Sequence, residues 1–341
     1  MYPAPAPLAA SGLAHGPRAD PRLASEAVQY ALDRLGTTRA DTVILFLSAH
    51  FANDPQPAIV AAARAAQTLA VTGCTALGVM TDEDWLLDTP AAAALLIRAE
   101  AAGHLSGTSL LALAAPDALH DDWLTTGPPR FGGIAGDATG LGPYKVWRMG
   151  KVLDQGYCEH PLPGCTLLVS RALKPLGEPF TVTGLAGFEL VSLDGRQASA
   201  TLRRAVDPLP PLHDIVLSEL DAHGKPLQSW PVLSLNPDSS VTIAGRPKIG
   251  DRVRWMHRCT DAARAEMAVL NAQPAPAFAM MFSCGGRGAA LHGTEDYEWS
   301  AVRKAWPGTP LIGLYGNGQI AHDEAETRLL RQSVVVASFG N

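Results

Sequence analysis

The segment Thr42-Val-Ile-Leu-Phe-Leu-Ser48 is a continuous apolar run of strand length. An unbroken run of this kind indicates a strand that is buried on both faces of its sheet. Helical patterns stand on either side: Asp20-Pro21 is a cap signal for a helix to about Leu35, and an Ala-rich helix is expected over 54–69. A second strand pattern follows at 71–80. The order of strand, helix and strand predicts an α/β fold.

The same pattern returns near the C-terminus. Phe278-Ala-Met-Met-Phe-Ser283 is a second buried-type strand that ends in serine, and a helix is expected after it. A segment with the spacing Gly-x4-Gly comes next in both places, and an apolar strand closes each one, at 91–97 and at 333–339. The corresponding glycines are Gly73 with Gly313 and Gly78 with Gly318. We interpret this as a duplicated, pseudo-symmetric α/β unit. Two ordinary units that share glycines by chance are the alternative.

Between these halves, from about 131 to 255, the apolar runs are short and turn signals such as Asp194-Gly195 separate them. The predicted fold class is therefore α/β, with two pseudo-repeated α/β units, mixed sheets and a largely antiparallel middle region. Residues 1–19 are expected to be a flexible lead-in. The proline-rich stretch 207–211 predicts a linker between one domain at 20–211 and another at 212–341.

Composition excludes several classes of function. The 341 residues carry 27 Lys and Arg against 33 Asp and Glu, so the net charge is −6, and polyphosphate repels such a chain, which argues against a nucleic-acid partner. No window approaches the length of an uncharged membrane span, so no membrane partner is expected. The five cysteines are odd in number and widely scattered. This pattern predicts no disulfide framework and a reducing, cytoplasmic setting.

The sharpest motif is Phe282-Ser-Cys-Gly-Gly-Arg-Gly288, where a buried strand ends and three glycines surround one arginine. Glycine lets the backbone approach a ligand, and consecutive amide groups can form a nest for an anion. The guanidinium of Arg287 suits a carboxylate. A ligand-binding loop is therefore predicted, and a tight turn with a solvated or paired arginine is the alternative. The predicted contacts here are Ser283, Cys284, Gly285, Gly286, Arg287 and Gly288.

The matching turns supply the other candidates, because ligands of open α/β sheets bind at strand ends. Asp137 follows a glycine-rich segment, and it is expected either to hold a ligand ammonium or to cap a turn. The remaining predicted contacts are Ser48, His50, Gly73, Cys74, Thr75, Gly78, Gly313, Tyr315, Gly318 and Gln319. The ligand is predicted to lie in a cleft between the two pseudo-repeated units.

Two other classes of function are weighed against ligand binding. In an enzyme, Cys284 or Ser283 would be the nucleophile, and His50 or His292 would be the base. In an interaction scaffold, only apolar side chains would line the space between the units.

Metal and cofactor chemistry is not predicted. The cluster Cys158-Glu-His160 with Cys165 lacks the second pair of ligands of a zinc site. The glycine-rich segments do not fit the phosphate-loop or dinucleotide fingerprints, so no cofactor is expected.

Taken in order, these motifs resemble the FIST proteins, named for F-box and intracellular signal transduction, over about residues 20–339. The segments that carry this resemblance are Phe282–Gly288, the acidic helix at Glu295, Gly313–Gly318, Thr72–Gly78, Arg130–Asp137, Cys165–Arg171 and Phe180–Thr183. The resemblance implies a FIST N-like domain at 20–211 and a FIST C-like domain at 212–341.

The resemblance also implies a function. The implied protein is a stand-alone sensory module and not an enzyme. It would bind a small ligand, either an amino acid or a small carboxylate, and act on an unknown downstream protein. The family pattern usually has glutamate after its last glycine, where this chain has Gln319. A ligand that is less cationic, or more weakly recognised, is therefore expected.

Overall fold

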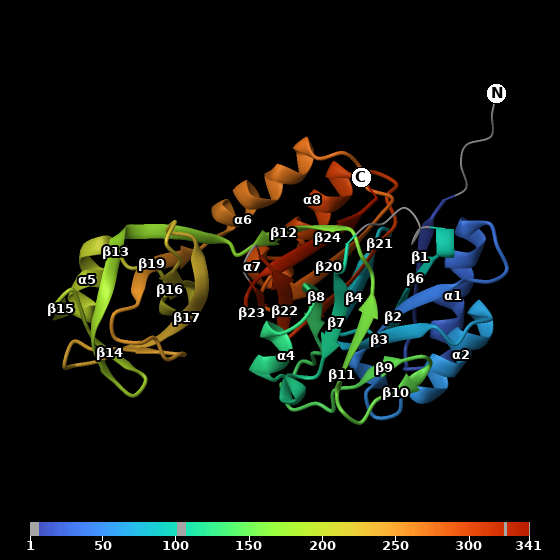
Figure 1. Ribbon diagram of the computed structural model, residues 1–341, viewed down its shortest axis with the longest axis horizontal. Helices are drawn as coiled ribbons and strands as arrows, with labels where there is room; N and C mark the ends of the chain where they lie inside the picture. The colour runs from blue at the N-terminus through green and yellow to red at the C-terminus, as the bar shows by residue number, and fades with distance from the viewer. Residues whose placement is uncertain (1–6, 101–106, 324–325, 341) are drawn as a thin grey trace. The chain divides into compact units, whose positions relative to one another are not determined.

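The computed structural model describes residues 7–100, 107–323 and 326–340 (Figure 1). It is mixed α/β, as the sequence predicts, and it divides into two compact units. The first unit is Met1–Ser170 with Met267–Asn341, and the second is Arg171–Glu266. The predicted domain boundary at residue 211 falls inside the second unit.

The first sheet of unit 1 has the strand order β1-β6-β2-β3-β9-β10. Strands β2 and β3 are parallel, whereas β6 runs antiparallel to both β1 and β2. Its strands are β1 (Ala9–His15), β2 (Thr42–Ser48), β3 (Val71–Ala76), β6 (Ala91–Ile97), β9 (Val146–Arg148) and β10 (Lys151–Val152). Helices α1 (Pro21–Leu35) and α2 (Gln56–Ala66) cover one face of this sheet.

The second sheet has the order β12-β24-β20-β21-β4-β5. Its strands are β12 (Cys165–Ser170), β24 (Val334–Phe339), β20 (Phe278–Cys284), β21 (Leu311–Gly316), β4 (Gly78–Thr81) and β5 (Trp85–Leu87). Its first four strands have the same order and directions as β1-β6-β2-β3, because β20 and β21 are parallel and β24 is antiparallel to its neighbours. The duplication itself stays a prediction. Helix α8 (Tyr297–Ala305) packs on the outer face, and the short α7 (Ala289–His292) precedes it.

The third sheet has the order β11-β7-β8-β22-β23. Its elements are β11 (Tyr157–Pro161), β7 (Leu110–Ala114), β8 (Arg130–Ile134), β22 (Gly318–His322), β23 (Thr327–Leu330) and the adjacent helix α4 (Asp121–Thr125). The two glycine-spaced turns therefore pass the chain between sheets. One leads from β3 in the first sheet to β4 in the second, and the other leads from β21 in the second to β22 in the third.

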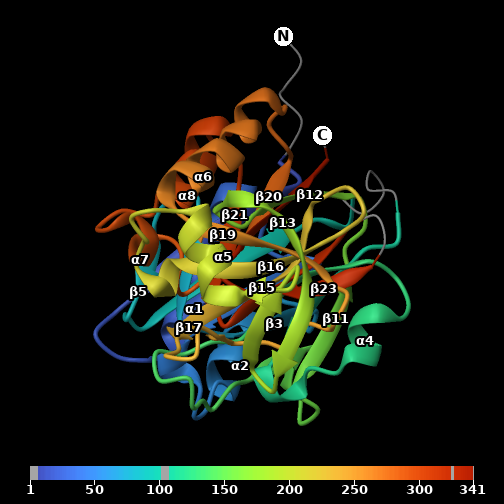
Figure 2. The same cartoon turned by 90° about the vertical axis from the view of Figure 1, so that its left-hand side faces the viewer.

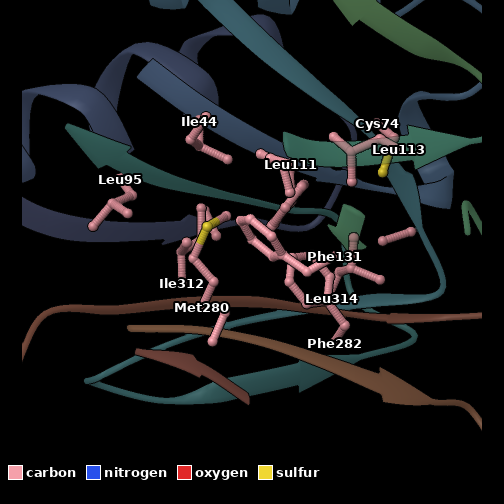
Figure 3. Close-up of a cluster of buried hydrophobic side chains, with 14 of the residues drawn as sticks. Ile44, Cys74, Leu95, Leu111, Leu113, Phe131, Met280, Phe282, Ile312 and Leu314 are labelled. Carbon is pink, nitrogen blue, oxygen red and sulfur yellow. The ribbon is translucent and has the colours of Figure 1, made fainter. Parts of the chain in front are cut away.

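Inner faces of all three sheets meet in one apolar core (Figure 3). Successive residues of a strand point to opposite faces, so β2 sends Ile44 and Phe46 into this core and its other apolar residues toward α1 and α2. The ring of Phe282 on β20 lies edge-on to Phe46 and to Phe131, with centroids 6.3 Å apart in both pairs. The two-sided burial predicted from the unbroken apolar runs is confirmed.

The N-terminal segment differs from the prediction. Residues Ala9–His15 form β1, and its first six residues are buried, so the expected flexible lead-in is wrong for this stretch. The sequence there is rich in small residues, which let the strand lie close beneath α1. A Cβ atom at Gly12 would lie 2.1 Å from the carbonyl oxygen of Ala27. The cap signal of α1 is confirmed, because the Asp20 carboxylate accepts the Arg22 amide at 2.9 Å.

Unit 2 confirms the antiparallel middle region (Figure 2). Its strand order is β13-β19-β16-β17-β18-β14-β15, and β13 also pairs with β14, which closes the sheet into a barrel-like form. Its elements are β13 (Leu173–Ala186), β14 (Glu189–Leu193), β15 (Arg196–Gln197), α5 (Ala198–Ala205), β16 (Ile215–Leu220), β17 (Pro226–Leu235), β18 (Val241–Ile243) and β19 (Arg252–Arg258), with α6 (Thr260–Met267) at its C-terminal end. Trp255 is at the centre of its core.

Replacement of Phe282 by alanine tests the shared core. Because Phe282 contacts aromatic rings from both other sheets, we expect Phe282→Ala to reduce the free energy of unfolding by about 3–5 kcal/mol. The measurement is urea unfolding. The matched control is Phe188→Ala, whose side chain is half exposed, with an expected loss of about 1 kcal/mol or less. Equal losses for the two variants would contradict a shared core centred on Phe282.

Candidate functional site

Carboxyl ends of both parallel strand pairs meet at one edge of unit 1. The turn after β3 and the turn after β21 are held together, since the Leu77 amide donates to the Tyr315 carbonyl at 2.9 Å. The loop after β20 joins them, because the Gly285 amide donates to the Gly316 carbonyl at 3.1 Å. We call this edge the strand-end rim; it consists of Leu77, Asp137, Tyr144, Lys145, Gly285 and Asn317.

The segment after β8 completes the rim. The Asn317 amide N–H donates to the Ile134 carbonyl at 3.2 Å, and its side-chain amide donates to the Tyr144 hydroxyl at 3.3 Å. Tyr144 in turn donates to Asp137 at 3.0 Å. The two glycine turns therefore meet at this edge, and a third segment lies beside them.

Asp137 organises its own loop. Its carboxylate accepts hydrogen bonds from Tyr144 and from the Thr139 hydroxyl, and also from the amides of Gly140 and Gly142 at 2.8 and 3.2 Å. Burial opposes ionisation of Asp137, but these four hydrogen bonds outweigh it and lower the pKa of the carboxyl group. The turn-capping alternative fits this arrangement, since these donors already occupy both carboxylate oxygens.

Lys145 is a rim residue that the sequence reasoning missed. Its backbone is fixed against β3, because the Thr75 amide donates to the Lys145 carbonyl at 2.9 Å and the Lys145 amide donates to the Thr75 hydroxyl at 3.0 Å. Within the part of the chain that the structure describes, its ammonium group makes no ion pair. The one signal for it is a basic residue directly before the strand 146–148, next to a Gly-Pro turn.

Arg287 is not arranged to bind a ligand carboxylate. The side chain is fully buried, and its guanidinium donates to the Glu298 carboxylate at 2.6 and 3.0 Å. Further hydrogen bonds go to the carbonyl and hydroxyl of Ser170 at 3.1 and 2.9 Å and to the Gln332 carbonyl at 3.1 Å. All five N–H donors of the guanidinium are thus used by the protein. This arrangement fits the alternative, a salt-bridged arginine. It corrects the prediction that Arg287 contacts a ligand carboxylate.

Next to this ion pair is a second buried acid. The carboxylate of Asp296 caps α8 by accepting the Trp299 amide at 2.9 Å, and it also accepts the Tyr315 hydroxyl. Gly288 has φ +54°, and a Cβ atom there would lie 2.7 Å from Asp296 Oδ2, so only glycine fits. Burial, followed by the nearby acid, raises the pKa of Tyr315. Of the predicted contacts, Tyr315 thus lies under the rim and not at its surface.

Several other predicted contacts lie inside the sheets. A Cβ atom at Gly73 would lie 1.7 Å from the Leu45 carbonyl oxygen, so this glycine serves the pairing of β2 with β3. The Gln319 amide is buried and accepts from the Ser333 amide at 3.3 Å. The other contacts buried in strands are Ser48, Cys74, Thr75, Gly78, Ser283, Gly313 and Gly318. Because apolar side chains fill the space between the sheets, the predicted cleft there is wrong.

Other predicted ligand contacts, at the strand ends, are half buried or exposed. Cys284, Gly285 and Gly286 are half buried, and His50 is exposed. The His50 ring nitrogen Nδ1 lies 3.3 Å from the Ser48 hydroxyl, which accepts the Ala91 amide at 3.0 Å.

The contacts do not assemble a nucleophile and a base. Ser283 is fully buried and its hydroxyl donates to the adjacent Cys284 carbonyl at 3.4 Å. His292 lies 3.0 Å from Glu298. Among the described residues, no hydrogen bond joins Ser283 or Cys284 to a histidine, and no group of three or more His, Cys, Asp or Glu is placed to hold a metal.

The chain matches two models of a family of signal-transduction domains of the sensory class. The model of the FIST N domain matches residues 41–196, and that of the FIST C domain matches residues 205–322. The chain belongs to the FIST family, whose name stands for F-box and intracellular signal transduction. None of the helices in ranges 7–100, 107–323 and 326–340 has the length and apolarity that crossing a membrane requires.

Similar proteins come from mycobacteria. An uncharacterized protein of Mycobacterium tuberculosis is 27% identical over 352 aligned residues, which cover 88% of this chain and 91% of the relative. An uncharacterized protein of Mycobacterium bovis is 29% identical over 212 residues, which cover 55% of this chain and 54% of the relative.

Removing one partner of the buried ion pair tests the role of Arg287. Arg287→Met leaves the Glu298 carboxylate buried without its cation, so we expect a loss of about 3–5 kcal/mol in the free energy of unfolding. The double variant Arg287→Met/Glu298→Met removes both charges and should be more stable than the single variant. The measurement is urea unfolding.

The control for this prediction is Arg22→Met, whose ion pair with Asp20 is exposed to solvent, so its loss should change the free energy of unfolding little. A loss for Arg287→Met no larger than that of the control would show that the ion pair does not hold the loop.

Proposed function

We propose that this protein is a sensory module that binds a small carboxylate at the strand-end rim and acts on a downstream protein. Membership of the FIST family supports the sensory class. The position of the rim at the strand ends supports the place of binding, and the side chains of the rim support its chemistry. Amino acids are included in the proposed class, because they carry the same carboxylate group.

One observation carries the proposal. The carboxyl ends of β2, β3, β20 and β21 converge with the segment after β8, and this convergence gathers Tyr144, Lys145 and Asn317 at one edge. Ligands of α/β sheets bind in this position, outside the carboxyl ends of the strands. The inner faces of the three sheets already pack against one another through apolar side chains.

Lys145 is the rim residue that can attract an anion, and Asp137 carries the opposite charge in its own loop. Lys145 contributes an ammonium group without an ion pair among the described residues, and the exposed Asn317 contributes an amide. A charge-assisted hydrogen bond to a carboxylate is stronger than a neutral one. Asp137 is already saturated with donors, so it is a weak candidate for holding a ligand ammonium.

A cytoplasmic setting is part of the proposal. All five cysteines are free thiols, including the half-buried Cys165, Cys259 and Cys284. Burial raises the pKa of Cys158 to about 12 and that of Cys74 well above its ordinary value, which keeps both thiols protonated and inert. Free thiols are typical of a reducing compartment.

A thermal-shift screen of amino acids and small carboxylates, followed by calorimetric titration, tests the proposed function. A ligand at 100 times its dissociation constant stabilises the protein by about 2.7 kcal/mol. Succinate and L-aspartate form a matched pair that differs by one ammonium group, and we expect succinate to bind at least as tightly. Lys145→Gln removes the rim cation and should weaken the carboxylate about tenfold or more.

The matched control is Lys304→Gln on the exposed side of α8, which should leave the affinity unchanged. The proposed function fails if no compound of the panel shifts the unfolding temperature. The placement at the rim fails if a ligand binds and Lys145→Gln has the affinity of the control.

A further inference from the structure

Beneath the rim, three buried polar atoms of Glu298 and His292 have no hydrogen-bond partner among the described residues, although one of them, His292 Nε2, lies within ion-pair distance of Glu298. Glu298 Oε1 receives Arg287 and also lies 3.0 Å from His292 Nε2. Its other oxygen, Oε2, is buried and has no hydrogen-bond partner among the described residues. The same holds for Nδ1 of His292. An unsatisfied buried carboxylate oxygen is expensive, so a donor is expected beside Glu298 Oε2.

The charges of the cluster indicate what that donor is. Arg287 balances one carboxylate, but Asp296 and Glu298 are both fully buried and stand two residues apart at the start of α8. With both carboxyl groups ionised, Arg287 alone leaves one negative charge of the buried cluster uncompensated. One additional proton makes the cluster neutral.

We propose that Asp296 and Glu298 share one proton in mildly acidic solution, and that loss of this proton as the pH rises to neutrality loosens the segment from Arg287 to Gly293. The shared proton gives Glu298 Oε2 its missing donor, since two carboxyl groups in contact form a hydrogen bond only when one of them is protonated. No ligand at the rim is needed for this device, so it goes beyond the proposed function.

Charged and titratable groups face the pair from the loop after β20, from α7 and from β21. Arg287 and His292 face Glu298, Tyr315 faces Asp296 from β21, and Asp84 acts on Tyr315 from the turn before β5. Burial, opposed by the hydrogen bonds from the Trp299 amide and Tyr315 and aided by the adjacent Glu298, raises the pKa of Asp296 to about 6. Burial also acts on Glu298, but Arg287 and His292 outweigh it and lower the pKa of Glu298. The extra proton therefore resides mainly on Asp296.

Beyond Arg287, the segment that responds is held by short-range backbone bonds. Helix α7 has four residues; the Leu291 and His292 amides donate to the Gly288 carbonyl, and the Gly293 amide donates to the Ala289 carbonyl. The ring of His292 packs on Tyr297 with centroids 5.3 Å apart. A negative charge created beneath it destabilises the buried side of this segment, whereas α1 and its cap lie in a different cluster.

Urea unfolding from pH 4 to pH 7 tests the shared proton. Because the pKa of Asp296 is raised in the folded state, the proton stabilises the protein at low pH, and this stabilisation is lost as pH rises from 3.8 to about 6. The variant Asp296→Asn keeps a cap for α8 and a donor toward Glu298 but cannot titrate. We expect the folded-to-unfolded ratio of wild type, relative to this variant, to fall about tenfold per pH unit across that window.

Asp54→Asn, at an exposed position, is the matched control and should follow wild type throughout. Superimposable profiles of wild type and Asp296→Asn would overturn the proposal. A slope that survives in Asp296→Asn and disappears in His292→Gln would overturn it as well, because the proton would then belong to His292.

Hydrogen exchange of the wild-type chain provides a test that needs no variant. After correction for the intrinsic rate, the protection of the amides of Leu291, His292 and Gly293 should fall between pH 5 and pH 7, while that of α1 stays constant. Constant protection of this segment over the same range would contradict the proposed loosening.

Discussion

The packing of the Phe282 ring against Phe46 and Phe131 is the contact on which unit 1 depends, because it joins a strand from each of three sheets. Each sheet buries its other face as well, under α1 and α2, under α8, or beside α4. The strands are therefore apolar on both sides, and polar side chains that act on a ligand are excluded from the sheet faces. Such polar side chains can act on a ligand only at the strand ends. The direction of each strand decides which ends lie together.

This constraint explains the two polar regions of unit 1. At the rim, parallel strands end together, and turn residues such as Asn317 and Tyr144 reach water. Below it, Arg287 is carried inward by the loop after β20, and the protein surrounds it with Glu298 and backbone acceptors. A guanidinium without water must be saturated in this way, so burial converts a residue type that suits a ligand carboxylate into a structural cross-link.

Much of the fold could be predicted from the sequence, because unbroken apolar runs and cap signals are local. The runs at 42–48 and 278–283 are strands buried on both faces, and Asp20 caps α1. The site was predicted less well. Burial of Arg287 depends on Glu298, eleven residues away, and on Ser170, 117 residues away, and no local pattern reveals either contact. Likewise, β1 consists mostly of small residues, which do not by themselves indicate a strand. It packs closely beneath α1.

Tyr315 connects the rim with the buried acids. Its carbonyl accepts the Leu77 amide, which holds the two turns together, and its hydroxyl donates to Asp296, whose carboxylate caps α8. The Trp299 indole on the first turns of α8 donates to the Thr81 carbonyl at 2.7 Å, so the helix is also fixed to β4, the strand that follows Leu77. A ligand at the rim and a proton at Asp296 would therefore act on the same short set of contacts. Because coupling between two binding events is reciprocal, any effect of the proton on ligand affinity must be matched by an effect of the ligand on the proton.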